Sequence, residues 1–574
     1  MFRELGRSEV YKDESMWNIT IKAPRLFQIA LGCIVLSIVW YAPAWMILRH
    51  AFIKPMAIES REGLTSSLFM EPPTWSVNGS EAYRLPILGW HSLRLSFATA
   101  ALAIPTATFI ALILCRCQWR SRPVFRLFWT SAIFLPLPVM AAAWLGAFGN
   151  LGRMQAFGMS DRPLISGWSA AALIHALSAI PLVVWVISGV MNQVDDSLES
   201  LARVDHPLPL AICHSTLKWC IPAAWSALLV VFILTAGDMT VTDLVQERTF
   251  AEEAYLQAQM GDGLTAAART ALAPTFLMTG LMITWASYHA RRAEKRGSIP
   301  DRLTLDRLWI KGWQTRIAAM LITAIAFIGW GVPFMALVWR AGRSGGDATL
   351  NIRPEWSLIA LGHNLRNAWP DLADSLPSTL MVASTIAITS TFLAWILAEL
   401  SAISSLFKWA ALTGAAIGLA VPGPVAGLAV QWLWTPYEAI YDSSAVIIAA
   451  QLFRLMPVTL ILLWPSIFYR SRPIQDLVDM DGLSARVLFW RLEWPTKGPV
   501  AIAAMGVTFG LSVGELPATN LVVPPGVEML SVRLWGLMHT GVESHLAAVV
   551  LLCMLAFCVM ITFGRIIRHF LGIP

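Results

Sequence analysis

Charged residues are scarce in this sequence. Asp, Glu, Lys and Arg make up only 14% of the 574 residues, whereas 56% are hydrophobic and the mean hydropathy is +0.61. A soluble fold cannot bury so much apolar surface, so this composition predicts a chain that crosses a membrane several times. The net charge of +6 comes from basic residues that lie between hydrophobic runs, which indicates membrane topology rather than nucleic-acid binding.

Motifs for covalent and nucleotide chemistry are also missing. The pattern Gly-x-x-x-x-Gly-Lys-Ser/Thr does not occur, so the chain has no loop that could cradle nucleotide phosphates. The seven Cys form no Cys-x-x-Cys pair, and His, Cys and acidic residues do not cluster at metal-binding or catalytic spacing. We therefore expect no catalytic residue, no bound cofactor and no firm metal site, which argues against a membrane-embedded enzyme.

The hydrophobic residues form twelve runs, each about 20 residues long or more and so able to cross a bilayer. Backbone groups in lipid must bond internally, so each run is predicted to be a helix of an all-α polytopic membrane protein. No small-residue cleavage site follows the first run, which predicts an uncleaved anchor in contact with membrane lipid. The runs lie near 26–48, 92–115, 127–149, 167–190, 222–245, 266–288, 317–339, 376–398, 409–434, 445–469, 496–515 and 546–564.

Lys and Arg distribute unevenly between these runs. If the N-terminus is cytoplasmic, the inner pieces carry 26 of them and the outer loops carry 12. Basic residues favour the cytoplasmic side, so both termini are predicted to be cytoplasmic.

Short patterns recur in the same order in the two parts of the chain. Such repetition indicates a duplicated unit, and it predicts two homologous six-helix halves, 1–296 and 317–574, joined by a basic cytoplasmic linker, 297–316. The recurring patterns pair 136–138 with 422–424, 92–93 with 375–376, Pro181 with Pro457, and 237–244 with 514–521.

The segment from Asp476 to Pro495 is a polar and apolar island between two hydrophobic runs. Gly482 separates a short amphipathic turn from a second helix, and Pro495 suits the first turn of the helix that follows. A helix–Gly–helix with one apolar and one charged face is suited to a groove on a partner protein. Taken alone, these residues are equally compatible with a connector on the membrane surface.

The spacing in this segment, with an acidic residue, Gly six positions later and Pro thirteen after that, resembles the coupling loop of binding-protein-dependent ABC importer permeases. In that family the loop usually reads Glu-Ala-Ala, then Gly, then Leu-Pro, and it fits into the ATPase subunit. Here Asp476-Leu477-Val478 and Trp494-Pro495 replace the end motifs. The resemblance implies that Asp476, Met480, Gly482 and Pro495 couple the chain to an ATPase.

A degenerate copy of the loop is predicted at 199–222 in the first half. It begins Glu199-Ser200-Leu201-Ala202-Arg203-Val204-Asp205, but Asp205 or His206 stands where Gly is expected. By the same resemblance, Glu199, Ala202, Arg203 and Asp205 are implied to contact the ATPase.

The segments 512–533 and 248–253 resemble the iron(III)-type branch of these permeases, which typically fuses two inner-membrane domains in one chain. The resemblance implies a multi-pass permease of the bacterial inner membrane that moves ferric iron. It also implies two copies of a separate ATPase subunit, which uses the ATP, and a periplasmic or surface-tethered substrate-binding protein. Related fused permeases carry thiamine, so thiamine or another small solute is an alternative. A second alternative is a twelve-helix secondary transporter driven by an ion gradient.

Three charged residues within the runs are candidates for the translocation pathway. Asp238 and Glu515 lie at matching positions, and Glu515 is 20 residues past Pro495, or about 30 Å along a helix. Acids inside spans are costly and often line a pathway, although each could instead cap a helix end beside water. Arg454 lies deep in its run and needs either an ion-pair partner or a path for its side chain to reach water.

Overall fold

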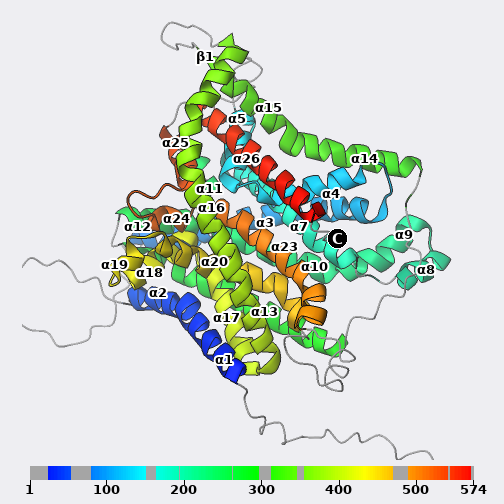
Figure 1. Cartoon of the computed structure of the whole chain (residues 1–574), viewed down its shortest axis with the longest axis horizontal. Coiled ribbons are helices and arrows are strands. Elements are labelled where there is room, and N and C mark those ends of the chain that lie inside the picture. Colours follow the sequence, from blue (N-terminus) through cyan, green and yellow to red (C-terminus); the bar gives the residue numbers. More distant parts are fainter. Residues whose placement is uncertain are drawn as a thin grey trace, which may run out of the picture.

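A computed structural model describes residues 23–52, 79–149, 163–192, 194, 196–260, 263–296, 310, 312–344, 355–468, 489–540 and 543–570 (Figure 1). These residues are almost entirely helical. Apart from one isolated bridge, the only strands among them are β1 (Arg343–Ser344) and β2 (Glu355–Trp356), which pair antiparallel in a short ribbon. The prediction of an all-α chain is therefore confirmed.

The described part of the first half of the chain contains twelve α-helices. Two π-helical turns, η2 (Leu36–Tyr41) and η4 (Cys213–Leu217), and one 3-10 turn, η3 (Ala132–Phe134), lie between them. The helices are α1 (Ala23–Val35), α2 (Ala42–Phe52), α3 (Gly79–Arg116), α4 (Arg122–Ser131), α5 (Leu137–Phe148), α7 (Gly167–Met191), α8 (Asp196–Asp205), α9 (Leu208–Ile212), α10 (Lys218–Ala236), α11 (Thr240–Leu244) and α12 (Phe250–Met260), and they are followed by α13 (Leu264–Arg296).

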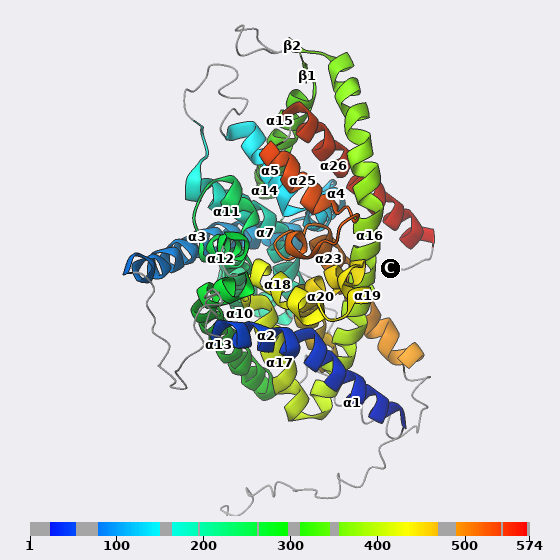
Figure 2. The same ribbon diagram turned by 90° about the vertical axis from the view of Figure 1, so that its left-hand side faces the viewer.

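The described part of the second half is also mainly helical. It also contains two π-helical turns, η5 (Phe327–Gly331) and η6 (Phe489–Glu493). Its helices are α14 (Trp313–Ala326), α15 (Val332–Ala341), α16 (Leu358–Ile403), α17 (Ser405–Ala420), α18 (Gly423–Trp434), α19 (Glu438–Tyr441), α20 (Ser444–Phe468), α23 (Trp494–Val513), α24 (Thr519–Val522), α25 (Leu530–Thr540) and α26 (Glu543–Phe570). Figure 2 shows α16 running along much of the length of the molecule.

Nine helices in the described part of the chain are long and apolar enough to cross a membrane, and two bent helix pairs could add two more. The last predicted run falls in α26, whose searched part, Glu543–Val559, is apolar. The polytopic membrane character predicted from the sequence is thus confirmed, whereas the count of twelve stays a prediction.

Proline explains the two bent pairs. The α4–α5 pair bends by 103° and the α17–α18 pair by 114°. A residue that precedes proline is forced out of the helical region. Accordingly Leu135 (φ −79°, ψ 113°) and Val421 (φ −69°, ψ 126°), which precede Pro136 and Pro422, are extended. The repeated Pro-x-Pro pattern therefore marks the break of one helix in each half.

The π-helical turns also occur at matching places, which the sequence analysis did not anticipate. In each half one turn interrupts the first apolar run, at η2 and η5. The other turn, at η4 and η6, directly precedes α10 and α23. Isolated π turns often mark functional sites, because they interrupt the regular bonding of the helix.

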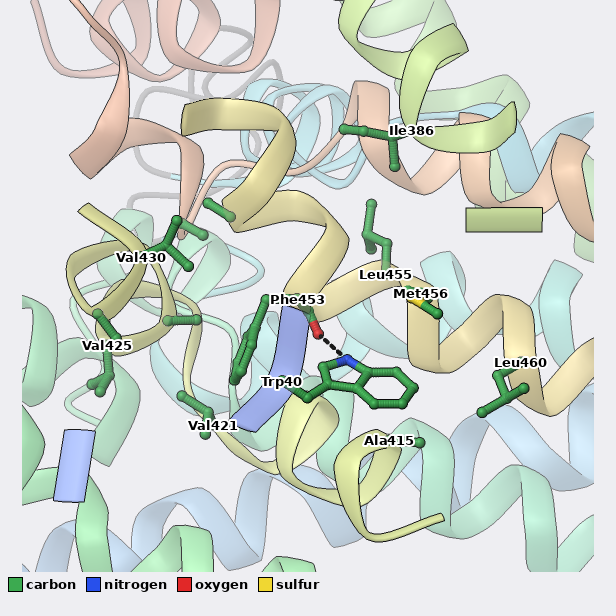
Figure 3. Close-up of a cluster of buried hydrophobic side chains, with 14 of the residues drawn as sticks. Trp40, Ile386, Ala415, Val421, Val425, Val430, Phe453, Leu455, Met456 and Leu460 are labelled. Atoms are coloured by element: carbon green, nitrogen blue, oxygen red, sulfur yellow. Dashed lines mark hydrogen bonds between the residues drawn. The ribbon is translucent and has the colours of Figure 1, made fainter. Parts of the chain in front are cut away.

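The two halves share an extensive interface, in which the first apolar segment of each half packs against helices of the other. In the first half, α1 lies against α16, η2 against α17 and α2 against α18 of the second half. Trp40, which is fully buried, donates from Nε1 to the carbonyl oxygen of Phe453 at 3.2 Å (Figure 3). The first apolar segment of the second half likewise packs against the first half, where Trp144 Nε1 donates to the carbonyl oxygen of Gly329 at 3.0 Å. The first apolar segment of each half is therefore part of the hydrophobic core of the other half.

Replacing Trp40 with Ala should lower the free energy of unfolding by about 3–5 kcal/mol, because it leaves a large cavity between the halves and removes a buried hydrogen bond. The matched control is Trp45→Ala, since Trp45 is 64% exposed on the same segment. Thermal unfolding in detergent can be followed by thiol labelling, because the buried Cys115, Cys117, Cys220 and Cys553 react only once they are exposed. Equal melting temperatures for the two variants would contradict this account of the core.

Candidate functional site

The first predicted coupling loop folds as the short helices α8 and α9, and Figure 1 shows both lying at the edge of the bundle. Glu199 of α8 is fully buried and accepts a hydrogen bond from Arg116 Nε at 2.8 Å. Arg116 ends α3 and also donates to the carbonyl oxygen of Met191, the last residue of α7, at 3.1 Å. The hydroxyl of Thr216, in η4, donates to the same Glu199 carboxylate. One buried carboxylate thus ties α8 to the ends of two long helices and to the π turn before α10.

The four coupling residues predicted in this loop do not share one environment. Arg203 and Asp205 are exposed and Ala202 is half-buried, whereas Glu199 faces inward onto Arg116. Glu199 is therefore placed to hold α8, not to touch a partner in this conformation. The outer face of α8 instead presents Leu201, 68% exposed, and Val204, 80% exposed, which the prediction did not include.

The second predicted loop lies mostly outside the described residues, including Asp476, Met480 and Gly482. Pro495 is described and lies in the first turn of α23, as the sequence suggested. Near it, Lys497 is almost fully buried, with Nζ 3.3 Å from Glu399 and 3.1 Å from Glu493. This three-charge cluster was missed, because Glu399 is almost one hundred residues away in the sequence.

The proline breaks meet glycines of the opposite half. A methyl group added to Gly514, at the end of α23, would lie 3.2 Å from the Cα of Pro136. In the matching place, the amide of Gly423 donates to the carbonyl oxygen of Gly237 at 3.5 Å, and Pro422 lies beside Gly237. At Gly514 the missing Cβ lets the two backbones approach closely, whereas the space beside Gly237 would accept a Cβ at an ordinary 3.9 Å from the Cα of Pro422. The bent helix of each half therefore rests on the end of α10 or α23 in the other half.

Glu515 directly follows one of these glycines and is 6% exposed. Its carboxylate accepts hydrogen bonds from the backbone amides of Ala518 and Thr519, both at 3.0 Å, and so caps α24. Arg454 of α20 forms an ion pair with it at 2.9 Å. Of the alternatives for Arg454, the structure shows the buried ion pair. Its guanidinium fits because residue 423 is Gly, where a Cβ would lie 2.1 Å from it.

Asp238 holds the equivalent place in the first half and is 8% exposed. It accepts hydrogen bonds from the Thr240 hydroxyl at 2.9 Å and the Val241 amide at 3.3 Å, so it caps α11. Nε2 of His175, in α7, lies 3.6 Å from Asp238 Oδ2. Both acids thus cap a short helix and also lie beside the contact between the halves.

A further polar cluster joins the halves beyond these acids. Asp243 of α11 faces His539 of α25 at 2.9 Å, and the amide of Asn520 donates to the hydroxyl of Tyr255 in α12 at 3.1 Å. Burial raises the pKa of Glu252, on α12, to about 7, and the charge of Asp243 adds to the rise. These contacts close one end of the interface between the halves.

Within the described residues no three His, Cys, Asp or Glu side chains converge well enough to hold a metal ion. No protein-family model matches the chain, and no curated protein is significantly similar to it.

Glu252 should make the stability of this cluster depend on pH. Its pKa in the folded chain, about 7, lies above the ordinary value of 4.5, so the folded state favours the neutral acid. Its contribution to stability is complete below about pH 4.5 and is lost as the pH rises through about 7. Glu252→Gln should therefore flatten the fall in melting temperature between pH 5 and pH 8. The neighbouring Glu253→Gln is the control, and a variant at 252 with the wild-type slope would contradict the assignment.

Proposed function

We propose that this chain is the membrane-spanning permease of a binding-protein-dependent ABC importer in the bacterial inner membrane, and that its cargo is ferric iron. The observation that carries the proposal is α8, at the place where the resemblance to such permeases puts a coupling loop. This helix offers an apolar and charged face to a partner while a buried carboxylate fastens it to the long helices. A connector lying on the membrane would need no such fastening.

The same contacts suggest how movement of a docked ATPase would reach the membrane core. A shift of α8 acts through Glu199 on the end of α3 and on the π turn η4, from which α10 continues without a break to Ala236. The next residue, Gly237, contacts the bent helix of the second half at Gly423. Motion of α8 would thus be delivered to the point where the halves meet, where an alternating-access pathway must open and close.

Both predicted loops would dock on ATPase subunits, one copy each, and both termini and the basic linker would face the cytoplasm. Substrate would arrive on the other side from a periplasmic or surface-tethered binding protein. The resemblance of 512–533 to the iron(III)-type branch supports the choice of cargo, and the acid Asp238, beside the contact between the halves, suits a cationic one.

Introducing a charge on the exposed face of α8 should release the ATPase. Loss of an apolar anchor of about 2 kcal/mol weakens binding roughly 30-fold, so Val204→Asp and Leu201→Asp should lose the P-loop ATPase on co-purification. Their melting temperatures should not change, since both side chains are largely in solvent. Gly482→Asp tests the second loop in the same way.

The control is Ile359→Asp, at an 86% exposed position near the start of α16. It should retain the ATPase. Retention of a wild-type amount of ATPase by Val204→Asp would overturn the coupling role of α8.

The Arg116–Glu199 pair permits a separation of folding from coupling. Arg116→Met alone leaves a buried carboxylate without its cation and should cost about 3–5 kcal/mol of unfolding free energy. The double variant Arg116→Met/Glu199→Met should recover most of that loss, since apolar replacement of a buried pair is often neutral. We expect the double variant to bind the ATPase but to transport poorly, because α8 is no longer tied to α3. Wild-type uptake by the stable double variant would show that the pair serves folding alone.

A further inference from the structure

The carboxylates at the matching positions of the two halves have different partners. Glu515 faces the guanidinium of Arg454, whereas Asp238 has no Lys or Arg partner in the part of the chain that the structure describes. The position of the first half that aligns with Arg454 is Ser178, which cannot supply a charge. A buried carboxylate inside a membrane bundle is unfavourable unless a positive charge lies beside it. The second half carries that charge in its own sequence, and the first half does not.

The group that faces Asp238 is an imidazole with a free nitrogen. His175 is 95% buried, since it is 5% exposed, and its Nε2 has no hydrogen-bond partner among the described residues. Its distance of 3.6 Å from Asp238 Oδ2 is too long for a hydrogen bond. Two ligand atoms that each lie about 2.1 Å from one metal ion are about 3.0 Å apart at an angle of about 90° and about 3.6 Å apart at about 120°, so the pair lies at the wide end of this range. The spacing therefore fits two ligands of one cation.

The chemical types of the two atoms also suit a metal cation. A neutral imidazole nitrogen together with a carboxylate oxygen suits a transition-metal cation such as iron. A cation held between them would give Asp238 the positive partner that Glu515 already has in Arg454. It would also satisfy the buried Nε2 of His175.

We propose that His175 and Asp238 together bind the metal cation as it passes between the halves, and that Arg454 prevents Glu515 from forming a second such site. The inference rests on the function proposed above and gives the cargo one point of contact with this chain. A pair of ligands holds a metal weakly, which suits a translocation site, because a transported ion must be able to leave. The remaining coordination positions stay with water or with the carrier of the iron.

The position of the pair supports this role. Asp238 directly follows Gly237, whose carbonyl oxygen accepts the cross-half bond from Gly423. The Asp238 side chain is 11% exposed, so the carboxylate is reachable without unfolding. Any rearrangement of the contact between the halves would move Asp238 relative to α7 and so change the distance between the two ligands.

The test measures binding of iron(III) citrate to the purified full chain by equilibrium dialysis, without the ATPase. Wild type should bind about one iron per chain, and His175→Asn and Asp238→Asn should each bind roughly tenfold more weakly or worse. A third variant combines Ser178→Arg with Leu137→Gly. It places in the first half the arginine that the second half has at 454 and the glycine that makes room for it, since Leu137 aligns with Gly423. The added guanidinium should neutralise Asp238 and abolish binding.

The matched control is Leu137→Gly with Ser178→Gln, which makes the same space but adds no charge and should bind iron as wild type does. Melting temperatures identify any variant that fails to fold. Equal binding by wild type, His175→Asn and the arginine transplant would overturn the proposal, as would the absence of iron binding to the wild-type chain. Because the assay needs neither ATP nor a partner, its failure would leave the coupling role of α8 intact.

Discussion

The contact between proline and glycine backbones, made twice across the two halves, is the constraint on which this structure depends. Pro136 lies on Gly514 and Pro422 lies on Gly237, and each proline also breaks the helix that carries it. A Cβ at Gly514 would lie 3.2 Å from the Cα of Pro136 and would crowd it, whereas a Cβ at Gly237 would lie 3.9 Å from the Cα of Pro422, which is an ordinary contact. The acids Asp238 and Glu515 follow these glycines directly, so their position is set by backbone packing and not by their own charges.

The ion pairs differ between the two predicted halves. At the centre, the second half pairs Glu515 with Arg454, while the first half pairs Asp238 with an imidazole. At the α8 end of the first half, Arg116 holds Glu199. The corresponding region of the second half has a buried lysine, Lys497, between two acids. The two predicted halves thus carry different sets of ion pairs, and the proposed cargo contact would use only the first half.

Much of this arrangement could be predicted from local sequence. Long apolar runs force helices in lipid, and the Pro-x-Pro pattern places the two breaks, since proline acts on the residue before it. The partners of the acids could not be predicted, because they are distant in sequence. Arg116 precedes Glu199 by 83 residues, Arg454 precedes Glu515 by 61, and His175 precedes Asp238 by 63. The inward orientation of Glu199 was missed for the same reason, since a family pattern records residue types and spacing but not direction.

The central claim is that movement of ATPase subunits, transmitted through α8, opens a path between the halves. The most direct test is uptake of radiolabelled iron into vesicles that contain this chain, its ATPase and iron-loaded binding protein. The account predicts uptake that requires ATP hydrolysis and is unaffected when proton and sodium gradients are collapsed. Uptake by the chain alone, driven by an imposed ion gradient and indifferent to ATP, would contradict it and identify a secondary transporter.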